Sequence, residues 1–336
     1  MSEYESTAPE SATKQEIVER FRAIAPGFAA RAAAAEQARR IPRESVKEML
    51  AAGLARILVP RRFGGYELDF DTWLDVILEI SRADASHGWC ASLIVHHAHL
   101  VGRFPEEAQR AVWRNGPDVV IAASLAPAAS ITSGEGGYCV SGRQSANASG
   151  VDHSSWVIVG GLVHDGGASE RKFFLIPQGE FQIRDTWFMA GMQATGSNTI
   201  VTDNVFVPST RVLGLSDLRE GRSPGGTQNA NPIFHTPFSY YAPITFLAPM
   251  LGAAQGAYRN FSELTKGRRA ADGTSVAEKT SVQVRMARSA ADLDTVELLL
   301  RRASRAANSS DDHSPDLLAR SVRDFARASE LGQIAE

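Results

Sequence analysis

The sequence predicts an α+β protein of several domains, in which a β domain lies between two helical domains. Three observations lead to this prediction. Up to residue 117, apolar residues recur at helical spacing. Short segments rich in valine, isoleucine and aromatic residues, separated by glycine, serine and aspartate, then fill residues 118–212. Beyond residue 236 the spacing is helical again, so the β domain is expected to have helices on both sides in sequence.

Length and composition exclude several classes of protein. A chain of 336 residues is long enough for two or three domains of about 100–200 residues each. The net charge of −3 gives no basic excess of the kind that binds nucleic acid. The N-terminus lacks the features of a signal peptide, and no apolar run approaches the ~18 residues that cross a membrane. We therefore expect a cytoplasmic protein without a nucleic-acid or membrane partner.

Three helices are expected in the first part of the N-terminal domain, residues 1–117. Residues 13–38 have helical spacing, with a Pro-Gly pair at 26–27 that should kink or break the helix. A second helix opens at Pro42 and ends near Gly53. The third covers Phe70–Ala83, and its apolar face carries Trp73, Val76, Ile77 and Ile80.

The β domain, residues 118–212, is followed by a segment of very different composition. Its expected strands lie in VVIAASL, GYCVSGRQ, SWVIVGGLV, KFFLIP and NTIVTDNVFVP. Residues 213–235 contain the sequence SPGG and few apolar side chains, which predicts an exposed, flexible loop. The two cysteines, Cys90 and Cys139, lie in apolar surroundings and are expected to be buried and reduced.

The C-terminal domain, residues 236–336, should form a helical bundle. Helices are expected at about 242–266, at 277–308 and from 315 onward. Three helices leave apolar faces that would prefer a fourth. We therefore expect an incomplete bundle, which either a partner or further residues of a longer chain would complete.

Three histidines lie close together in the helical segment 89–104. At about 100° per residue, His96 and His99 share one side of the helix while His97 points elsewhere, so the three cannot bind one metal ion. No metal site is predicted. For each histidine the plainer interpretation is a core or surface residue whose ring nitrogens are satisfied. His97 is the one that we single out as a functional candidate.

Two predicted strands end in serine. Ser124 closes VVIAAS, and Ser149 precedes the cluster DHSSW, which adds His153 and Trp156. Serines at strand ends often only close turns. Together with small neighbours they also allow a flat ligand to approach, with hydroxyl and N–H groups at its polar edge. The sequence has no GxGxxG or GxxxxGKS motif, which argues against Rossmann and P-loop sites.

Six segments, in this order, resemble the acyl-CoA dehydrogenase fold family over essentially the whole chain. Within that family, the SG-x-DH-xx-W form, His97 and the Thr-Gly-Ser turn are similar to the two-component flavin-dependent monooxygenases. The six segments are VPRRFGG (59–65), SRADASHGW (81–89), FPEEAQRAVW (104–113), GGYCVSGRQSANASGVDHSSW (136–156), ATGSNTIVTDNVFVP (194–208) and the Gly-Arg pair at 267–268.

The resemblance implies both a fold and a reaction. The fold would be that of the acyl-CoA dehydrogenases, and the protein would be the oxygenase component of a two-component enzyme. It would take reduced FMN or FAD from a separate flavin reductase, use O2 to form a C4a-hydroperoxyflavin, and hydroxylate a small phenolic or other aromatic substrate. The resemblance also implies a homotetramer and no metal cofactor.

The resemblance further implies roles for individual residues. Ser149 matches the family serine near flavin N5, Ser124 matches a serine on the neighbouring strand, and His97 matches the residue that meets the substrate hydroxyl; these three are the candidate catalytic residues. Further flavin contacts are expected from His153, Trp156, Thr195, Ser197 and Arg268. Substrate contacts are expected from Trp89, His235, Phe238 and Tyr240, beside His97.

The expected chemistry limits what His97 can do. A phenol with a pKa near 10 and a histidine with a pKa near 6.5 differ by about 3.5 units, or roughly 4.8 kcal/mol for complete proton transfer. Complete deprotonation of the substrate beforehand is therefore too costly. We expect a neutral His97 that accepts the proton as the C–O bond forms.

Three other functions remain open at this point. One is an acyl-CoA dehydrogenase-like flavoprotein, one is a relative that N-hydroxylates amino sugars, and one is a non-catalytic scaffold. Family members continue beyond the point where this sequence stops, with a helical segment that carries another histidine near the flavin. Acyl-CoA dehydrogenases carry their catalytic glutamate in the same late region. Both diagnostic residues would lie outside this sequence.

Overall fold

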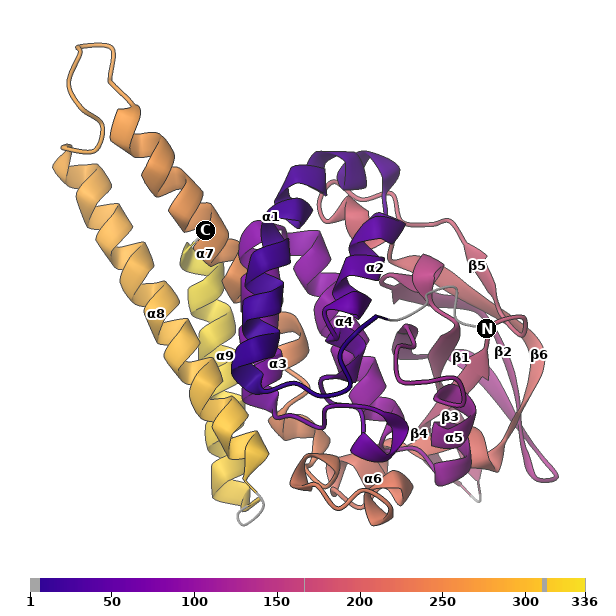
Figure 1. Cartoon of the computed structure of the whole chain (residues 1–336). Helices are drawn as coiled ribbons and strands as arrows, with labels where there is room; N and C mark the ends of the chain where they lie inside the picture. The colour runs from indigo at the N-terminus through magenta and orange to yellow at the C-terminus, as the bar shows by residue number, and fades with distance from the viewer. Residues whose placement is uncertain (1–6, 166, 310–312, 336) are drawn as a thin grey trace.

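The fold was examined in a computed structural model, which describes residues 7–165, 167–309 and 313–335. A layer of N-terminal helices lies between a β-sheet layer and the C-terminal helices, from which a long helical hairpin projects (Figure 1). The predicted order of helices, strands and helices is confirmed.

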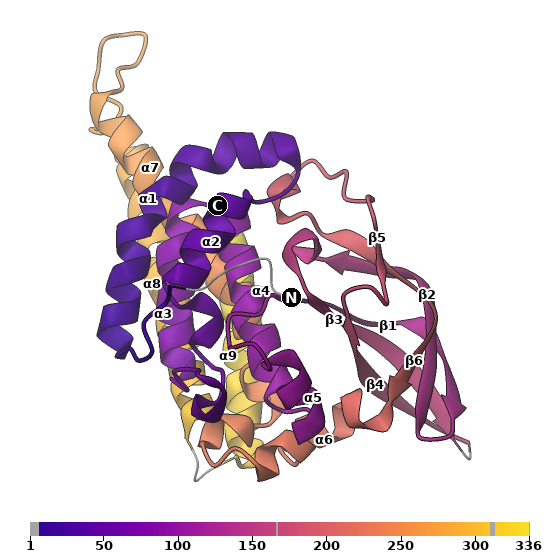
Figure 2. The same cartoon turned by 45° about the vertical axis from the view of Figure 1, so that its right-hand side comes forward.

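The N-terminal layer is built from five helices. Helix α1 opens with a capping box in which the Thr13 and Glu16 side chains bond to each other's backbone N–H. It continues unbroken through Pro26, and its ribbon is bent in Figures 1 and 2. Asp84 ends one helix and caps the next by accepting a hydrogen bond from His87 N. The five are α1 (Lys14–Ala38), α2 (Arg43–Ala51), α3 (Phe70–Ala83), α4 (Ala85–Val101) and α5 (Glu106–Val112).

The β layer has the strand order β5-β6-β2-β1-β3-β4-β7 in the described parts of the chain. Strand β1 joins its two halves, because residues 121–129 pair with β3 in parallel and residues 130–134 pair with β2 in antiparallel fashion. The register of the parallel pair shifts just after Ser124. The strands are β1 (Ile121–Gly134), β2 (Gly137–Ala148), β3 (Trp156–Asp165), β4 (Ala168–Pro177), β5 (Gln182–Arg184), β6 (Asn198–Pro208) and β7 (Val212–Gly214).

Residues 213–235 are not the exposed loop that their glycine and proline content predicts. They form helix α6 (Leu215–Arg219) and two short 3-10 turns, and Asn229 is only 4% exposed. The amide of Asn229 donates to Gly102 O at 2.9 Å, and Gly225 N donates to Arg103 O at 3.0 Å. The end of α4 therefore satisfies polar groups that were expected to face water.

The C-terminal part consists of α7 (Ile244–Gly267), α8 (Thr280–Asn308) and α9 (Pro315–Ala335), as predicted. The end of α7 and the start of α8 extend beyond the rest of the molecule, with Arg268 near the tip (Figure 1). We call this projection the arm. Its exposed apolar side chains include Phe261, Leu264 and Val284.

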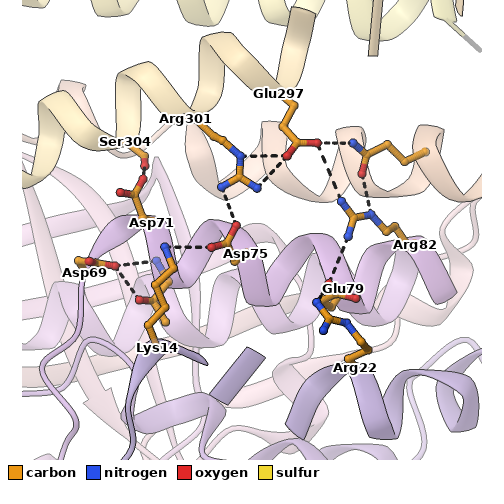
Figure 3. Close-up of polar contacts among 12 residues, drawn as sticks. Lys14, Arg22, Asp69, Asp71, Asp75, Glu79, Arg82, Glu297, Arg301 and Ser304 are labelled. Carbon is orange, nitrogen blue, oxygen red and sulfur yellow. Dashed lines mark hydrogen bonds and ion pairs between the residues drawn. The ribbon is translucent and has the colours of Figure 1, made fainter. Parts of the chain in front are cut away.

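Charged side chains tie α8 to the N-terminal layer (Figure 3). Arg301 on α8 donates to Asp75 of α3 at 2.7 Å, and Lys14 of α1 reaches the other oxygen of the same carboxylate at 2.9 Å. A second path runs from Glu297 on α8 through Gln255 of α7, whose amide nitrogen lies 2.7 Å from the carboxylate, to Arg82 of α3, whose Nε donates to Gln255 Oε1 at 2.7 Å. Three helices distant in sequence are thus held to α3.

Two further observations concern membrane-spanning helices and the two cysteines. No helix among them is both long and apolar enough to cross a bilayer. Cys90 is buried, as predicted, whereas Cys139 is only half-buried; both are free thiols.

Candidate functional site

Helix α4 lies between the sheet and the other helices and presents different side chains to each. His97 bonds through Nδ1 to Ile121 O, at the first residue of β1, over 2.8 Å. His96 and His99 point to the opposite side, where their rings lie 5.9 and 4.8 Å from the ring of Tyr241. The predicted separation of His97 from the other two histidines is therefore present in the structure.

His97 is a buried, neutral base. Burial lowers its pKa to about 4, and the hydrogen bond to Ile121 offsets only part of this shift. Because a carbonyl oxygen only accepts hydrogen bonds, Nδ1 carries the ring hydrogen and Nε2 keeps its lone pair. Among the described residues, no hydrogen bond engages Nε2. The lone pair of Nε2 is thus available to a proton from another molecule.

A row of hydroxyl groups lies where α4 meets the end of β2. Trp89 Nε1 on α4 donates to Ser149 Oγ at 3.0 Å. Ser149 Oγ lies 2.7 Å from Ser197 Oγ, which lies 2.7 Å from Thr195 Oγ1. Thr195 Oγ1 donates to Met192 O at 2.9 Å. The three hydroxyl-bearing side chains are at most 8% exposed, so this row is part of the interior.

Two tight turns give these side chains their positions. Ser149 follows the last residue of β2 and precedes Gly150, whose φ of 67° starts the short turn into β3. Thr195 is the last residue of the 3-10 turn Gln193–Thr195, which is flanked by left-handed residues at 192 and 196, and Ser197 follows this turn. We call this second segment, residues 192–197, the TGS turn. Gly150 N donates to Thr195 O at 2.8 Å, so the two turns are hydrogen-bonded to each other.

The end of α1 supports the TGS turn. Glu36 accepts hydrogen bonds from the backbone N–H groups of Gln193 at 2.8 Å and Ala194 at 3.3 Å. The same carboxylate accepts from Ser86 Oγ of α4 at 2.7 Å. Glu36 thus satisfies the free N–H groups at the start of the 3-10 turn and ties that turn to α4. No sequence feature indicates this role, because Glu36 lies in an alanine-rich helix with no motif around it.

Ser124 belongs to the same region but uses its hydrogen within the sheet. It is 4% exposed and donates to Ala146 O of β2 at 2.8 Å. No described residue donates a hydrogen bond to Ser124 Oγ, so its lone pairs can accept one. Ser124, Ser149 and His97 are therefore all anchored near the first residues of β1 and the last residues of β2. The prediction that a strand ends at Ser124 is wrong, because β1 continues to Gly134 after a shift in register.

Several predicted site residues have other partners. His153 Nε2 bonds to Ile41 O at 3.0 Å, next to α2, and burial lowers its pKa. Tyr240 donates its hydroxyl hydrogen to Ser314 O at 2.9 Å, beside the start of α9. His235 is exposed and bonds to Asn229 O. Arg268 is exposed near the tip of the arm. The structure does not bring these four to the hydroxyl row.

Three other predicted residues lie on or beside α4. Phe238 is 5.8 Å from the His96 ring, centroid to centroid, and 5.5 Å from that of Tyr241. Trp89 packs 5.4 Å from the half-exposed ring of Phe246 on α7. Trp156, at the start of β3, packs against the apolar cluster between α4, α5 and the sheet. Aromatic surfaces therefore flank both ends of the helix that carries His97.

This donor and acceptor set fits a planar heterocycle with polar edges. Small side chains and backbone form the ends of β1 and β2, the indole of Trp89 offers an aromatic surface, and Ser149 and Ser124 offer oxygen lone pairs. Metal ligands are not gathered here: among the described residues, no three His, Cys, Asp or Glu side chains form a group that could hold an ion.

Comparisons with known proteins agree with this site. The family model described as "Acyl-CoA dehydrogenase, N-terminal domain" matches residues 11–116, and "Acyl-CoA dehydrogenase, C-terminal domain" matches residues 244–335. The flavin-dependent monooxygenase oxygenase subunit HsaA of Rhodococcus jostii (strain RHA1) is 37% identical over 282 residues, covering 82% of this chain and 73% of the relative.

Two further similarities point the same way. The oxygenase component of FADH2-dependent resorcinol hydroxylase from Rhizobium sp. (strain MTP-10005) is 35% identical over 313 residues, covering 90% of this chain and 76% of the relative. The crystal structure of the HsaA monooxygenase from M. tuberculosis superposes with a TM-score of 0.90 at 31% identity, covering 96% of this chain and 85% of that one. The chain therefore belongs to the acyl-CoA dehydrogenase fold family, within its group of flavin-dependent monooxygenase oxygenase components.

Proposed function

We propose that this protein binds reduced flavin supplied by a separate reductase and uses O2 to hydroxylate a small aromatic substrate that carries a phenolic hydroxyl. The observation that carries the proposal is the environment of His97. Its Nδ1–H is bonded to a carbonyl of β1, and its Nε2 lone pair is free, on the same helix as the indole that meets Ser149. A proton acceptor for the substrate thus lies beside the wall proposed for the flavin.

The lowered pKa of His97 limits when it can accept a proton from the substrate. Between an ordinary phenol near pKa 10 and His97 at about 4 the gap is about 6 units, or roughly 8 kcal/mol for complete proton transfer. His97 therefore orients the hydroxyl and accepts its proton only as the ring is oxygenated. The bound flavin would supply the activated oxygen, and Ser149 and Ser124 would hold its polar edge. The buried position of these side chains would keep water away.

The direct test supplies the protein with chemically reduced FMN or FAD, 18O2 and a panel of phenols that includes resorcinol. Incorporation of one 18O atom into a hydroxylated phenol is expected. FAD should serve, because a relative at 35% identity is named as FADH2-dependent. Release of all the oxygen as H2O2 with every phenol would contradict the proposal. Bleaching of bound oxidised FAD by an acyl-CoA thioester would instead indicate a dehydrogenase.

The arm supports a proposed assembly. It exposes Phe261 and Leu264, at 47% and 74%, on a surface that no other described part of the chain covers. In a homotetramer this surface and Arg268 would lie against another copy, where the guanidinium is suited to a flavin phosphate. Sedimentation should give about four times the chain mass of 36.2 kDa. We place this assembly in the cytoplasm, together with the reductase.

A further inference from the structure

The hydroxyl row described above has ends of opposite chemical character. At one end, the indole N–H of Trp89 can only donate. At the other end, the carbonyl of Met192 can only accept, and it receives hydrogen bonds from Thr195 Oγ1 at 2.9 Å and Trp187 Nε1 at 3.0 Å. Between these ends lie three hydroxyl groups, each with a single hydrogen.

These ends fix the direction of every hydrogen bond in the row. Thr195 gives its hydrogen to Met192 O, so it must accept from Ser197. Ser197 has then used its hydrogen and must accept from Ser149. Ser149 accepts from Trp89 and has spent its own hydrogen on Ser197. What remains on Ser149 Oγ is one lone pair, and so Ser149 can accept but cannot donate.

We propose that this direction makes the site selective for the reduced state of its flavin. The inference rests on the proposed function, with Ser149 at flavin N5 as the family resemblance implies. A reduced flavin carries a hydrogen on N5 and can donate it to the free lone pair of Ser149. An oxidised flavin presents a lone pair at N5. This lone pair would face the free lone pair of Ser149 Oγ, and no hydrogen bond could form. Thr195 and Ser197 are thus positioning residues, since they act on the flavin only through Ser149.

Reversal of the row is costly. For Ser149 to donate outward, its hydrogen must leave Ser197, and two buried oxygens 2.7 Å apart would then share no hydrogen unless the next bond also reverses. Reversing the next hydrogen bond as well only shifts the missing hydrogen bond one step along the row. In the end, Thr195 no longer donates to Met192 O. One buried hydrogen bond is therefore forfeited, which corresponds to roughly a tenfold preference for reduced over oxidised flavin.

Relaxation of the TGS turn is also opposed by the surrounding structure. Glu36 holds the start of the turn and, through Ser86, the first turn of α4. Trp89 lies on the same helix, one turn after Ser86, and starts the hydroxyl row. The hydrogen bonds therefore form a closed ring through α1, the TGS turn, the end of β2 and α4. A gap opened at one hydroxyl pair would have to distort the whole ring.

Two variants remove the hydrogen-bonding constraint without changing the Ser149 side chain. In Thr195→Val, Ser197 is free to donate to Ser149, which then has a hydrogen to offer outward. In Ser197→Ala, Ser149 loses its acceptor directly. Thr195→Ser keeps a hydroxyl in the row and is the conservative control. Thr199→Val is the matched control, because it makes the same chemical change in a hydroxyl pair with Thr186 that is outside the row.

The measurement is the ratio of dissociation constants for oxidised and reduced flavin, titrated anaerobically with FMN and with FAD on the full chain. We expect the unmodified protein to favour reduced flavin. Thr195→Val and Ser197→Ala should lower this ratio by roughly tenfold, mainly through tighter binding of oxidised flavin. Thr195→Ser and Thr199→Val should leave it within about threefold of the original.

The outcomes separate the two proposals. Flavin binding with the same ratio in all variants would overturn the inference and leave the proposed function standing. A fall in the ratio that Thr199→Val also produces would overturn it too, because the effect would not depend on the row. Absence of binding to either flavin by the unmodified protein would overturn both.

Discussion

Burial gives the neighbouring histidines of α4 very different chemistry from that of histidine in water. The pKa values of His97 and His99 fall to about 4 and about 3, and that of His96 also falls well below its usual value. All three are neutral at pH 7. They differ in their neighbours: His97 bonds to β1, while His96 and His99 are enclosed by aromatic rings.

Replacing His97 tests its role as the proton acceptor. His97→Asn should lower the hydroxylation rate by about 10²- to 10⁴-fold and leave the affinity for reduced flavin within a few fold, because the histidine faces the substrate. The rate of hydroxylated product formation and the flavin titration provide the two measurements. His164→Asn, at an exposed histidine of β3, is the control. Equal losses in flavin affinity and in rate would contradict this assignment.

The same histidines predict how stability depends on pH. In the unfolded chain they take up protons below about pH 6.5, whereas folded His97 and His99 do so only near 4 and 3. Their contribution is complete above pH 6.5 and is lost as the pH falls. Each should lower the free energy of unfolding by up to about 1.4 kcal/mol per pH unit between about 6 and 4.

Urea unfolding at a series of pH values measures this dependence. Below pH 6 the slope for His97→Asn should be smaller by close to one proton than that of the unmodified protein. An unchanged slope would mean that His97 is protonated in the folded state at these pH values.

Some site residues could be predicted from the sequence, and others could not. Ser149 and His97 lie in local motifs, a strand end and a helix face, that fix where they point, whereas the strand predicted to end at Ser124 continues to Gly134. The partners of His153 and Tyr240, which are Ile41 and Ser314, are more than 70 residues away in the chain. Glu36 has its role only because the TGS turn packs against it. Contacts of this kind depend on tertiary packing, which leaves no mark on short stretches of sequence.

At the scale of elements, apolar spacing predicted the helices well and composition misled for one segment. The predicted third helix, Phe70–Ala83, coincides with α3 because nearly all of its apolar side chains are buried on one side. Glycine, proline and asparagine in residues 213–235 indicated a loop in water. These residues instead fit a narrow space: a Cβ added at Gly225 would lie 2.3 Å from Gly102 O. The small side chains allow close packing there.

Replacing Asn229 tests whether this segment is fixed. Asn229→Ala removes the hydrogen bonds to Gly102 O and from Arg62 Nε and should cost about 1–3 kcal/mol locally. Hydrogen exchange at residues 223–234 should speed up, while α3 stays protected. Thr227→Ala, at an exposed neighbour, is the control. Fast exchange throughout the segment before any substitution would show that it is a flexible loop after all.

At the scale of the whole molecule, the ion pairs of Figure 3 couple the C-terminal helices to the layer that carries the site. Asp75 of α3 is shared by Lys14 of α1 and Arg301 of α8, and its side chain is only 17% exposed. A carboxylate held between two cations in partial burial is expected to contribute more than an isolated surface pair.

A double-mutant cycle measures this coupling. Asp75→Asn and Arg301→Met should show an interaction free energy of about 1 kcal/mol in urea unfolding. The pair Glu106 and Arg110, in which the arginine is 69% exposed, serves as the control and should give about 0.5 kcal/mol or less. Equal values for both pairs would mean that the link between α3 and α8 has no special strength.

The overall architecture was predictable because six sequence segments kept the family order and because the three regions differ in periodicity. The long projection of α7 and α8 was not. Helical spacing gives the length of a helix but not the point at which its neighbours stop covering it. Leu264 is 74% exposed, yet nothing in the sequence distinguishes it from a buried leucine.

The position of Cys90 makes its rate of alkylation a measure of local opening in the folded protein. Its sulfur lies 3.6 Å from Thr195 O, between α4 and the TGS turn, and burial raises the pKa of the thiol. A thiol in this state does not react with alkylating reagents, since the thiolate is the reactive form. Iodoacetamide can therefore modify Cys90 only when α4 and the TGS turn move apart. The rate of alkylation at Cys90 reports how often this opening occurs, and half-buried Cys139 serves as an internal reference on the same chain.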